Sequence, residues 1–192
     1  MEVLDYIVDR IKKHHELYDL PVFGELWEEV LHKSFKDAGQ KSDWKPNRSH
    51  AVGMDIVHEE HGRISCKSGT YEKRVKKSDT LKINGSRTTQ YPTLEEKLEF
   101  LSESKDDVYY CLGKIGEEWK QGLKRYYLFV FKSDILDLSK QNWQPFKTKK
   151  GNAGGWRCSN EKYSAEIRKT MSDQLWVTFN TDYLPEPYFI EV

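Results

Sequence analysis

The first part of the chain alternates apolar and charged positions with the period of an α-helix. In residues 2–17 apolar side chains recur every three or four positions, and the same spacing returns over residues 22–39. Gly39 closes the second run, at a position where helices commonly end. The pattern predicts two amphipathic helices, followed by an exposed polar loop over residues 40–52.

Two short apolar runs come next, within residues 53–69, and they are separated by the polar sequence EEHG. This arrangement favours a β-hairpin. Residues 80–86 have the composition of a further strand. Residues 92–104 carry leucines on one stripe, and Thr93 stands where a residue would cap the helix, so a third helix is predicted there.

The rest of the chain is rich in β-branched and aromatic residues. Residues 107–115 and 125–136 give the strongest strand pattern, with a turn between them. Residues 163–175 are predicted to form a helix, and residues 176–179 a last strand. This order of elements indicates an α/β (α+β) fold class, with a central mixed β-sheet flanked by helices in one 192-residue domain.

Composition narrows the class of protein. Aromatic residues make up 13% of the chain and the mean hydropathy is −0.82, which is typical of a globular domain with a polar surface. The sequence contains no apolar run near the ~20 residues of a membrane span, and the N-terminal segment lacks the order of a signal peptide. Three scattered cysteines do not make a disulfide framework. We therefore expect a cytoplasmic protein without a membrane partner.

Charge is distributed unevenly although the net charge is zero. Residues 61–90 contain eight Lys or Arg against two Asp or Glu, and residues 140–169 repeat that balance. Residues 1–38 contain nine acids against five bases. Binding to a polyanion depends on the local potential, so a neutral total is compatible with a basic cleft. The charge distribution leaves two interpretations of the basic segments open: they are solvated loops, or they form a surface that binds nucleic acid.

Asp55 and Lys67 occupy the open end of the predicted hairpin, about equally far from its turn. Antiparallel pairing would bring paired Cβ atoms to about 5 Å of each other. Ser65 and Lys67 would share one face of the second strand, and Ile64 and Cys66 the other. A carboxylate, a lysine and a carbonyl can hold Mg²⁺ and a water. The alternative is a solvated cross-strand ion pair, which contributes little to stability.

An aspartate, nine intervening residues and then the sequence SCK resemble the core motif of the PD-(D/E)xK nuclease superfamily, which includes most type II restriction endonucleases. The order of elements over residues 22–132 also resembles the core of that superfamily. The sequence GMDI lacks the proline of the motif, and Ser65 stands where the second acid is expected. Some restriction enzymes of the superfamily carry such an S-x-K variant and supply the acid from a helix.

The resemblance implies a role for each matching residue. Asp55 and the carbonyl of Cys66 would bind the metal, and Lys67 would hold the attacking water. Glu28 is the first candidate for the missing acid and Glu25 the next, although both can equally be exposed acids of an amphipathic helix. The third helix is ranked below them as a source of the acid, with Glu95, Glu96 and Glu99.

The function implied by the resemblance is Mg²⁺-dependent hydrolysis of double-stranded DNA at a specific sequence, by a homodimer that leaves 5′-phosphates. A repair or recombination nuclease of the superfamily is an alternative. A nucleic-acid-binding domain with a decayed site is another, for which Ser65 is the evidence. Basic recognition loops are predicted at about residues 68–90 and 140–160. The predicted DNA contacts are Lys73, Arg74, Lys76, Lys77, Arg87, Thr88, Lys149, Lys150 and Arg157.

Overall fold

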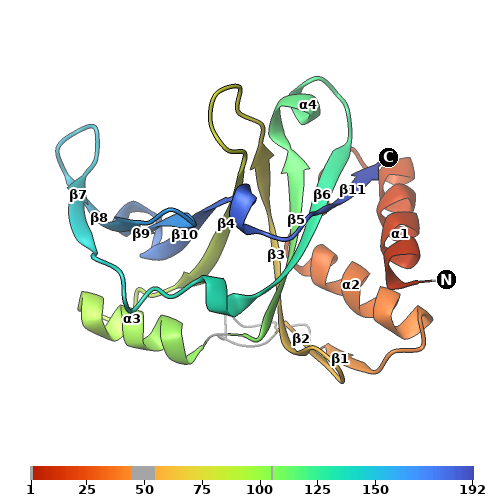
Figure 1. The fold of residues 1–192 in the computed structure, drawn as a ribbon, viewed down its shortest axis with the longest axis horizontal. Coiled ribbons are helices and arrows are strands. Elements are labelled where there is room, and N and C mark those ends of the chain that lie inside the picture. The colour runs from red at the N-terminus through yellow and green to blue at the C-terminus, as the bar shows by residue number, and fades with distance from the viewer. Residues whose placement is uncertain (1, 45–54, 105) are drawn as a thin grey trace.

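The structure is a computed structural model that describes residues 2–44, 55–104 and 106–192. In this part of the chain an 11-stranded mixed sheet is flanked by four α-helices (Figure 1). The predicted fold class, a mixed sheet flanked by helices, is therefore confirmed.

The helices are α1 (Val3–Leu17), α2 (Glu25–Asp37), α3 (Leu94–Glu103) and α4 (Gly116–Lys120). The strands are β1 (Ser42–Trp44), β2 (Ile56–His58), β3 (Gly62–Glu72), β4 (Thr80–Arg87), β5 (Val108–Ile115), β6 (Arg125–Lys132), β7 (Gln144–Lys147), β8 (Ala153–Ser159), β9 (Tyr163–Arg168), β10 (Gln174–Asn180) and β11 (Tyr188–Glu191). The main path of the sheet runs β11-β6-β5-β3-β4-β10-β9-β8-β7.

Strand β3 changes its neighbour along one of its sides. Its first residues pair antiparallel with β2 as far as Ile64, and its last residues pair antiparallel with β4 from Gly69 onward. On the other side β3 runs parallel to β5 from Ile64 to Tyr71. Because β2 and β4 separate here, residues 65–68 lie in a fork between the two strands. We call this place the strand fork.

The alternation of β3 side chains divides the core into two layers. Ile64 and Cys66 point into the layer under α1 and α2, together with the fully buried Trp27. The indole of Trp27 donates to the carbonyl of Tyr110 at 3.0 Å, which fixes α2 against β5. The opposite layer is built around Tyr71 and its neighbours, with α3 beside it. Figure 1 shows α1 and α2 on one side of the central strands and α3 on the other.

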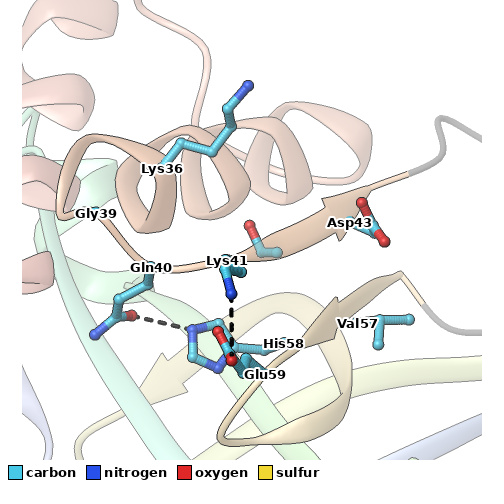
Figure 2. Close-up of a pocket in the computed structure, with 9 residues that line it drawn as sticks. Lys36, Gly39, Gln40, Lys41, Asp43, Val57, His58 and Glu59 are labelled. Carbon is cyan, nitrogen blue, oxygen red and sulfur yellow. Dashed lines mark hydrogen bonds and ion pairs between the residues drawn. The ribbon is translucent and has the colours of Figure 1, made fainter.

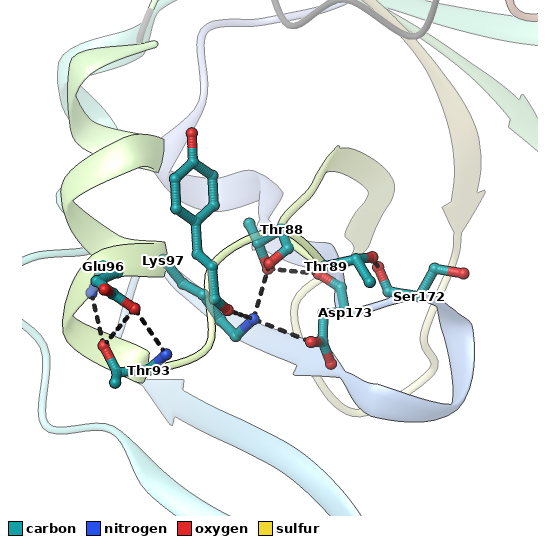
Figure 3. A network of polar contacts seen from close by, with 8 residues as sticks. Thr88, Thr89, Thr93, Glu96, Lys97, Ser172 and Asp173 are labelled. Atoms are coloured by element: carbon teal, nitrogen blue, oxygen red, sulfur yellow. Dashed lines mark hydrogen bonds and ion pairs between the residues drawn. The ribbon is translucent and has the colours of Figure 1, made fainter.

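A buried lysine holds α3 in place. Lys97 is 1% exposed, and its Nζ donates to the carbonyl of Thr88 at 2.8 Å and to Oδ2 of Asp173 at 2.9 Å. It also donates to the carbonyl of Tyr91. Figure 3 shows these contacts joining α3 to the end of β4 and to the turn before β10. Thr93 caps α3 as predicted, since its hydroxyl accepts from the Glu96 N–H.

The predicted helix over residues 163–175 is wrong, because this segment forms β9, a 3-10 turn and the start of β10. Its buried side chains, Tyr163, Ala165 and Ile167, alternate with the period of a strand. The predicted loop over residues 40–52 contains β1 in its described part, and residues 45–54 lie outside the described residues.

The two predicted basic recognition loops are mostly strands. Residues 68–90 contain the end of β3 and the whole of β4, with a connection at 73–79. Residues 140–160 contain the β7–β8 hairpin, whose turn carries Lys149 and Lys150. The basic side chains therefore lie on a rigid sheet and its turns.

Candidate active site

Asp55 and Lys67 converge at the strand fork, as the hairpin pattern predicted. Oδ2 of Asp55 accepts from Nζ of Lys67 at 3.2 Å and from the backbone N–H of Cys66 at 2.7 Å. The side chains of Lys67 and Asp55 are 24% and 16% exposed, so the pair lies at the boundary between core and solvent. The carboxylate is therefore held by two donors and is partly shielded from water.

The strand fork explains why this backbone is available to a site. Pairing with β2 ends at Ile64 and pairing with β4 begins at Gly69, so the Cys66 N–H donates to Asp55 instead. The N–H and C=O of one strand residue point to the same side, so the Cys66 carbonyl is also directed toward Asp55. The thiol of Cys66 is buried on the opposite face, and burial raises its pKa well above the usual value. Only the carbonyl of Cys66 is therefore suited to bind a cation.

Lys67 remains a cation in this environment. Burial acts to lower the pKa of Lys67, but the charge of Asp55 and the hydrogen bond to it outweigh burial and raise that pKa above its ordinary value. A permanently charged ammonium can orient a water and offset the charge of a phosphate. It is a poor general base, because it has no free lone pair near neutral pH.

Glu28 lies beside this pair on α2. The Gly24 N–H donates to Oγ of Ser68 at 3.2 Å, which places the first turn of α2 against the strand fork. Burial raises the pKa of Glu28, and the charge of Asp55 raises it further, although the indole of Trp44 donates to Oε2 at 3.3 Å. Glu28 is thus close enough to Asp55 for their charges to interact. This agrees with the expectation that the second helix supplies an acid near Asp55.

The other predicted acids do not converge on Asp55 in the same way. Glu25 is exposed in the first turn of α2. On α3, Glu95 and Glu99 are exposed, and Glu96 is engaged with Thr93 in the cap of the helix. Among the predicted helix acids, Glu28 has the position closest to what the motif requires.

Asp106 is a site residue that sequence reasoning missed. It lies two residues before β5 and is 9% exposed, and it lines a small pocket together with Ser65, Lys67 and Tyr109. Burial raises the pKa of Asp106, polar contact with the Ser65 hydroxyl lowers it, and the charge of Asp55 raises it again. Two aspartates immediately before a strong strand pattern were the available signal in the sequence.

The oxygen atoms available at the strand fork fit a magnesium ion that is held by few protein ligands. Within residues 2–44, 55–104 and 106–192, no three His, Cys, Asp or Glu side chains surround one point. Mg²⁺ in enzymes is usually bound by one or two carboxylates and several waters. Asp55, one neighbouring carboxylate and the carbonyl of Cys66 meet that requirement, so the residues present are compatible with Mg²⁺.

The predicted DNA contacts of the β3–β4 connection lie at the far end of β3. Lys73 begins this connection six residues after Lys67, about 20 Å further along the strand. Nζ of Lys73 is 2.9 Å from Oε1 of Glu118, and Arg74 is 3.8 Å from Glu72. The other basic residues of this connection, Lys76 and Lys77, are exposed.

The end of β4 returns to the site. Gly85 and Ser86 line the same pocket as Lys67, and the following Arg87 is exposed. Thr88 is fully buried and its hydroxyl donates to the carbonyl of Asp173 at 2.7 Å, so the structure contradicts its assignment to a DNA groove. Arg87 is therefore the predicted DNA contact best placed near Asp55 and Lys67.

The remaining predicted DNA contacts lie on the β7–β8 hairpin. Lys149 and Lys150 are exposed in its turn. Arg157 is exposed on β8, and its guanidinium lies 5.9 Å from the ring centre of Phe146. These cations are accessible, at the edge of the sheet that β7 forms.

A separate groove lies between the end of α2 and the β1–β2 hairpin (Figure 2). Two pairs of the side chains drawn there contact each other: Lys41 Nζ is 3.6 Å from Glu59 Oε1, and His58 Nε2 is 3.0 Å from Gln40 Oε1. Nδ1 of His58 accepts from the N–H groups of residues 60 and 61, so Nε2 carries the proton. His58 is 2% exposed, which is consistent with a structural role.

Comparisons of the chain with protein-family models, with curated proteins and with solved structures gave no match. In the part of the chain that the structure describes, no helix combines the length and apolarity needed to cross a membrane. Function is therefore inferred from the chemistry at the strand fork.

Proposed function

We propose that this protein is a Mg²⁺-dependent endonuclease that hydrolyses phosphodiester bonds of double-stranded DNA at a specific sequence, as type II restriction enzymes do. The observation that carries the proposal is the Asp55 carboxylate, which accepts from both the Cys66 N–H and the Lys67 ammonium. This joins an acid, a cation and a backbone carbonyl at one place, on the residues that resemble the nuclease motif.

The order of elements supports the same family. Asp55 directly precedes β2 and the S-x-K sequence lies on β3, with β4, α3 and β5 following. The resemblance drew on this order of a helix, a strand hairpin, a helix and further strands. A homodimer acting on a palindromic site, in the cytoplasm, is part of the proposal.

The protein side chains have distinct roles in the proposed reaction. Lys67 stays protonated, so it orients the attacking water and offsets the negative charge that builds on the phosphate. Asp55 holds that ammonium and presents its carboxylate beside the Cys66 carbonyl. When bound, Mg²⁺ would polarise the phosphate and lower the pKa of a water. Glu28 adds negative charge next to Asp55, which favours a cation at this place.

A second function is a nucleic-acid-binding domain that has lost catalysis. The observation that favours it is Ser65, a hydroxyl at the position of the second acid. Such a domain would bind DNA without cutting it in Mg²⁺. A repair or recombination nuclease would instead prefer branched or damaged DNA over intact plasmid.

Cleavage of a plasmid of known sequence separates these functions. The full chain is incubated with supercoiled DNA in Mg²⁺, beside Lys67→Met and Asp55→Asn. The expected result is discrete bands from the wild type and a rate lower by roughly 100-fold or more in either variant. The matched control is Lys13→Met, which removes a lysine paired with Asp9 at 2.7 Å on α1 and should cut normally. DNA binding without cutting would refute the nuclease and support the binding domain.

A further inference from the structure

Asp106 is fixed beside Ser65 by the backbone around it. The N–H of Arg63 donates to Oδ2 of Asp107 at 2.7 Å, and the N–H of Asp107 donates to the carbonyl of Arg63 at 2.8 Å. The hydroxyl of Ser133 donates to the carbonyl of Asp106. These contacts fasten the residues that lead into β5 against β3 and against the end of β6. A side chain on such a support has a defined position, which a metal ligand needs.

The carboxylate of Asp106 is buried without a full set of partners. The side chain is 9% exposed, and Oδ1 is buried with no hydrogen-bond partner among the described residues. The guanidinium of Arg63 is 3.5 Å from Oδ1, which is longer than a charge-assisted hydrogen bond. A buried carboxylate oxygen whose nearest cation is at this distance costs free energy, which a bound metal ion would offset.

The pocket in front of Asp106 has the size and chemistry of an ion and water site. Its volume is about 90 Å³, well below the ~300 Å³ at which pockets begin to enclose small-molecule ligands. Ser65, Lys67 and Tyr109 line it, and Ser86, Ser102 and Ser104 are among its other polar lining residues. A cation with its waters fits such a space, and a nucleotide base does not.

The register of the sheet brings this acid to the strand fork. Ser65 pairs with Tyr109 across the parallel β3–β5 ladder, and Asp55 lies opposite Ser65 by continuation of the β2–β3 register. Asp106 is three residues before Tyr109, and its carboxylate has a hydrogen bond with the Ser65 hydroxyl and interacts with the charge of Asp55. Ser65, which stands at the position of an acid in the nuclease motif, therefore contacts an acid from the segment that leads into the neighbouring strand β5.

We propose that Asp106 supplies the second acidic metal ligand in place of the acid missing at Ser65, so that Asp55 and Asp106 hold the divalent cation and Lys67 lies next to it. This inference rests on the proposed nuclease function. Glu28 then adds negative charge without binding the ion directly. Ser65 positions the Asp106 carboxylate through its hydroxyl and leaves room for the ion, where a longer acid would fill the pocket.

Binding of Mn²⁺, followed by electron paramagnetic resonance and by the rise in melting temperature, tests the assignment on the full chain. Asp106→Asn and Asp55→Asn should each weaken Mn²⁺ binding by more than about tenfold. Loss of a metal ligand lowers metal affinity more than loss of a residue that only orients a ligand. Glu28→Gln should have a smaller effect. The matched control is Asp9→Asn, because Asp9 pairs with Lys13 at 2.7 Å on α1 and does not line this pocket, and this variant should bind Mn²⁺ as the wild type does.

Stability without metal distinguishes a ligand from a structural acid. A ligand with an unpartnered oxygen predicts that metal-free Asp106→Asn melts at or above the wild-type temperature. A structural partner of Arg63 predicts a lower melting temperature and unchanged Mn²⁺ affinity, which would overturn the inference. Should Asp106→Asn not fold, Asp106→Glu keeps the charge but displaces the oxygens by one methylene. Weakened Mn²⁺ binding then supports the ligand role, and unchanged binding overturns it.

The plasmid assay separates this inference from the function on which it rests. A wild type that binds Mn²⁺ and cuts DNA, beside an Asp106→Asn variant that does both equally well, overturns the Asp106 assignment and leaves the nuclease intact. A wild type that neither binds Mn²⁺ nor cuts DNA overturns both. Metal binding that needs Asp106 without cutting supports the site and refutes the nuclease.

Discussion

Removing the charge of Lys97 should destabilise the whole domain. Lys97→Met keeps the length of the side chain but leaves the carbonyls of Thr88 and Tyr91 and the carboxylate of Asp173 without their donor. Breaking a buried pair from one side costs about 3–5 kcal/mol. The Asp173 side chain is 19% exposed and can regain water, so the expected loss lies near the lower end, about 3 kcal/mol. For a chain of this length that lowers the melting temperature by roughly 6–12 °C.

Urea unfolding, followed by tryptophan fluorescence, measures this loss. The matched control is Lys33→Met, which removes a lysine paired with Glu29 at 2.5 Å on the surface of α2 and should cost about 0.5 kcal/mol or less. Asp173→Asn removes the partner charge, and asparagine tolerates the left-handed backbone at that position (φ 47°). Combined with Lys97→Met it should cost less than the sum of the two, by about 1 kcal/mol. A Lys97→Met protein as stable as Lys33→Met would refute a stabilising role for these contacts.

Three further variants test the packing of the sheet and the buried His58. Gly69→Ala should lower the free energy of unfolding by about 2–3 kcal/mol, since a Cβ would lie 2.1 Å from the Lys82 carbonyl. Gly85→Ala, where the Cβ meets only the movable side chain of Leu175, should cost less in the same urea assay, and equal costs would contradict this reasoning. Burial lowers the pKa of His58 below 6.5, so the unfolded chain takes up the proton more readily and stability should fall as the pH drops below that value. His58→Asn should reduce this fall between pH 7.5 and 5.5, and an unchanged slope would count against it.

Local patterns in the sequence were sufficient to predict the hairpin and the meeting of Asp55 with Lys67. Both depend on a strand period of two and on residues 12 positions apart. Asp106 could not be found in this way, because its place beside Ser65 follows from the parallel pairing of β3 with β5 across 44 residues. No local pattern encodes which strands become neighbours over that separation.

The error of element type over residues 163–175 has a physical cause. Residues 163–175 include several good helix formers, yet Tyr163, Ala165 and Ile167 are buried on one face of β9, because pairing with β10 and β8 outweighs local propensity. For Lys97, by contrast, the local sequence did indicate the structure. Lys97 lies three residues after Leu94 and four before Leu101, on the apolar stripe of α3. A charge on such a stripe indicates a buried partner, and this signal was available before the structure.

The strand fork explains how one short motif can acquire a site. A continuous hairpin would satisfy the Cys66 backbone with a partner strand and leave Asp55 and Lys67 as a surface ion pair of little value. Because β2 and β4 diverge, the carboxylate of Asp55 takes the Cys66 N–H and turns toward Lys67, and the parallel β5 brings a buried acid to the same place. The carboxylates of Glu28 and Asp106 both have raised pKa values because burial disfavours their charge, and Asp55 adds to the effect. The charges of Asp55 and Lys67 act on both Glu28 and Asp106, so these acids share one region of negative potential. Negative charge of this kind favours the binding of a divalent cation.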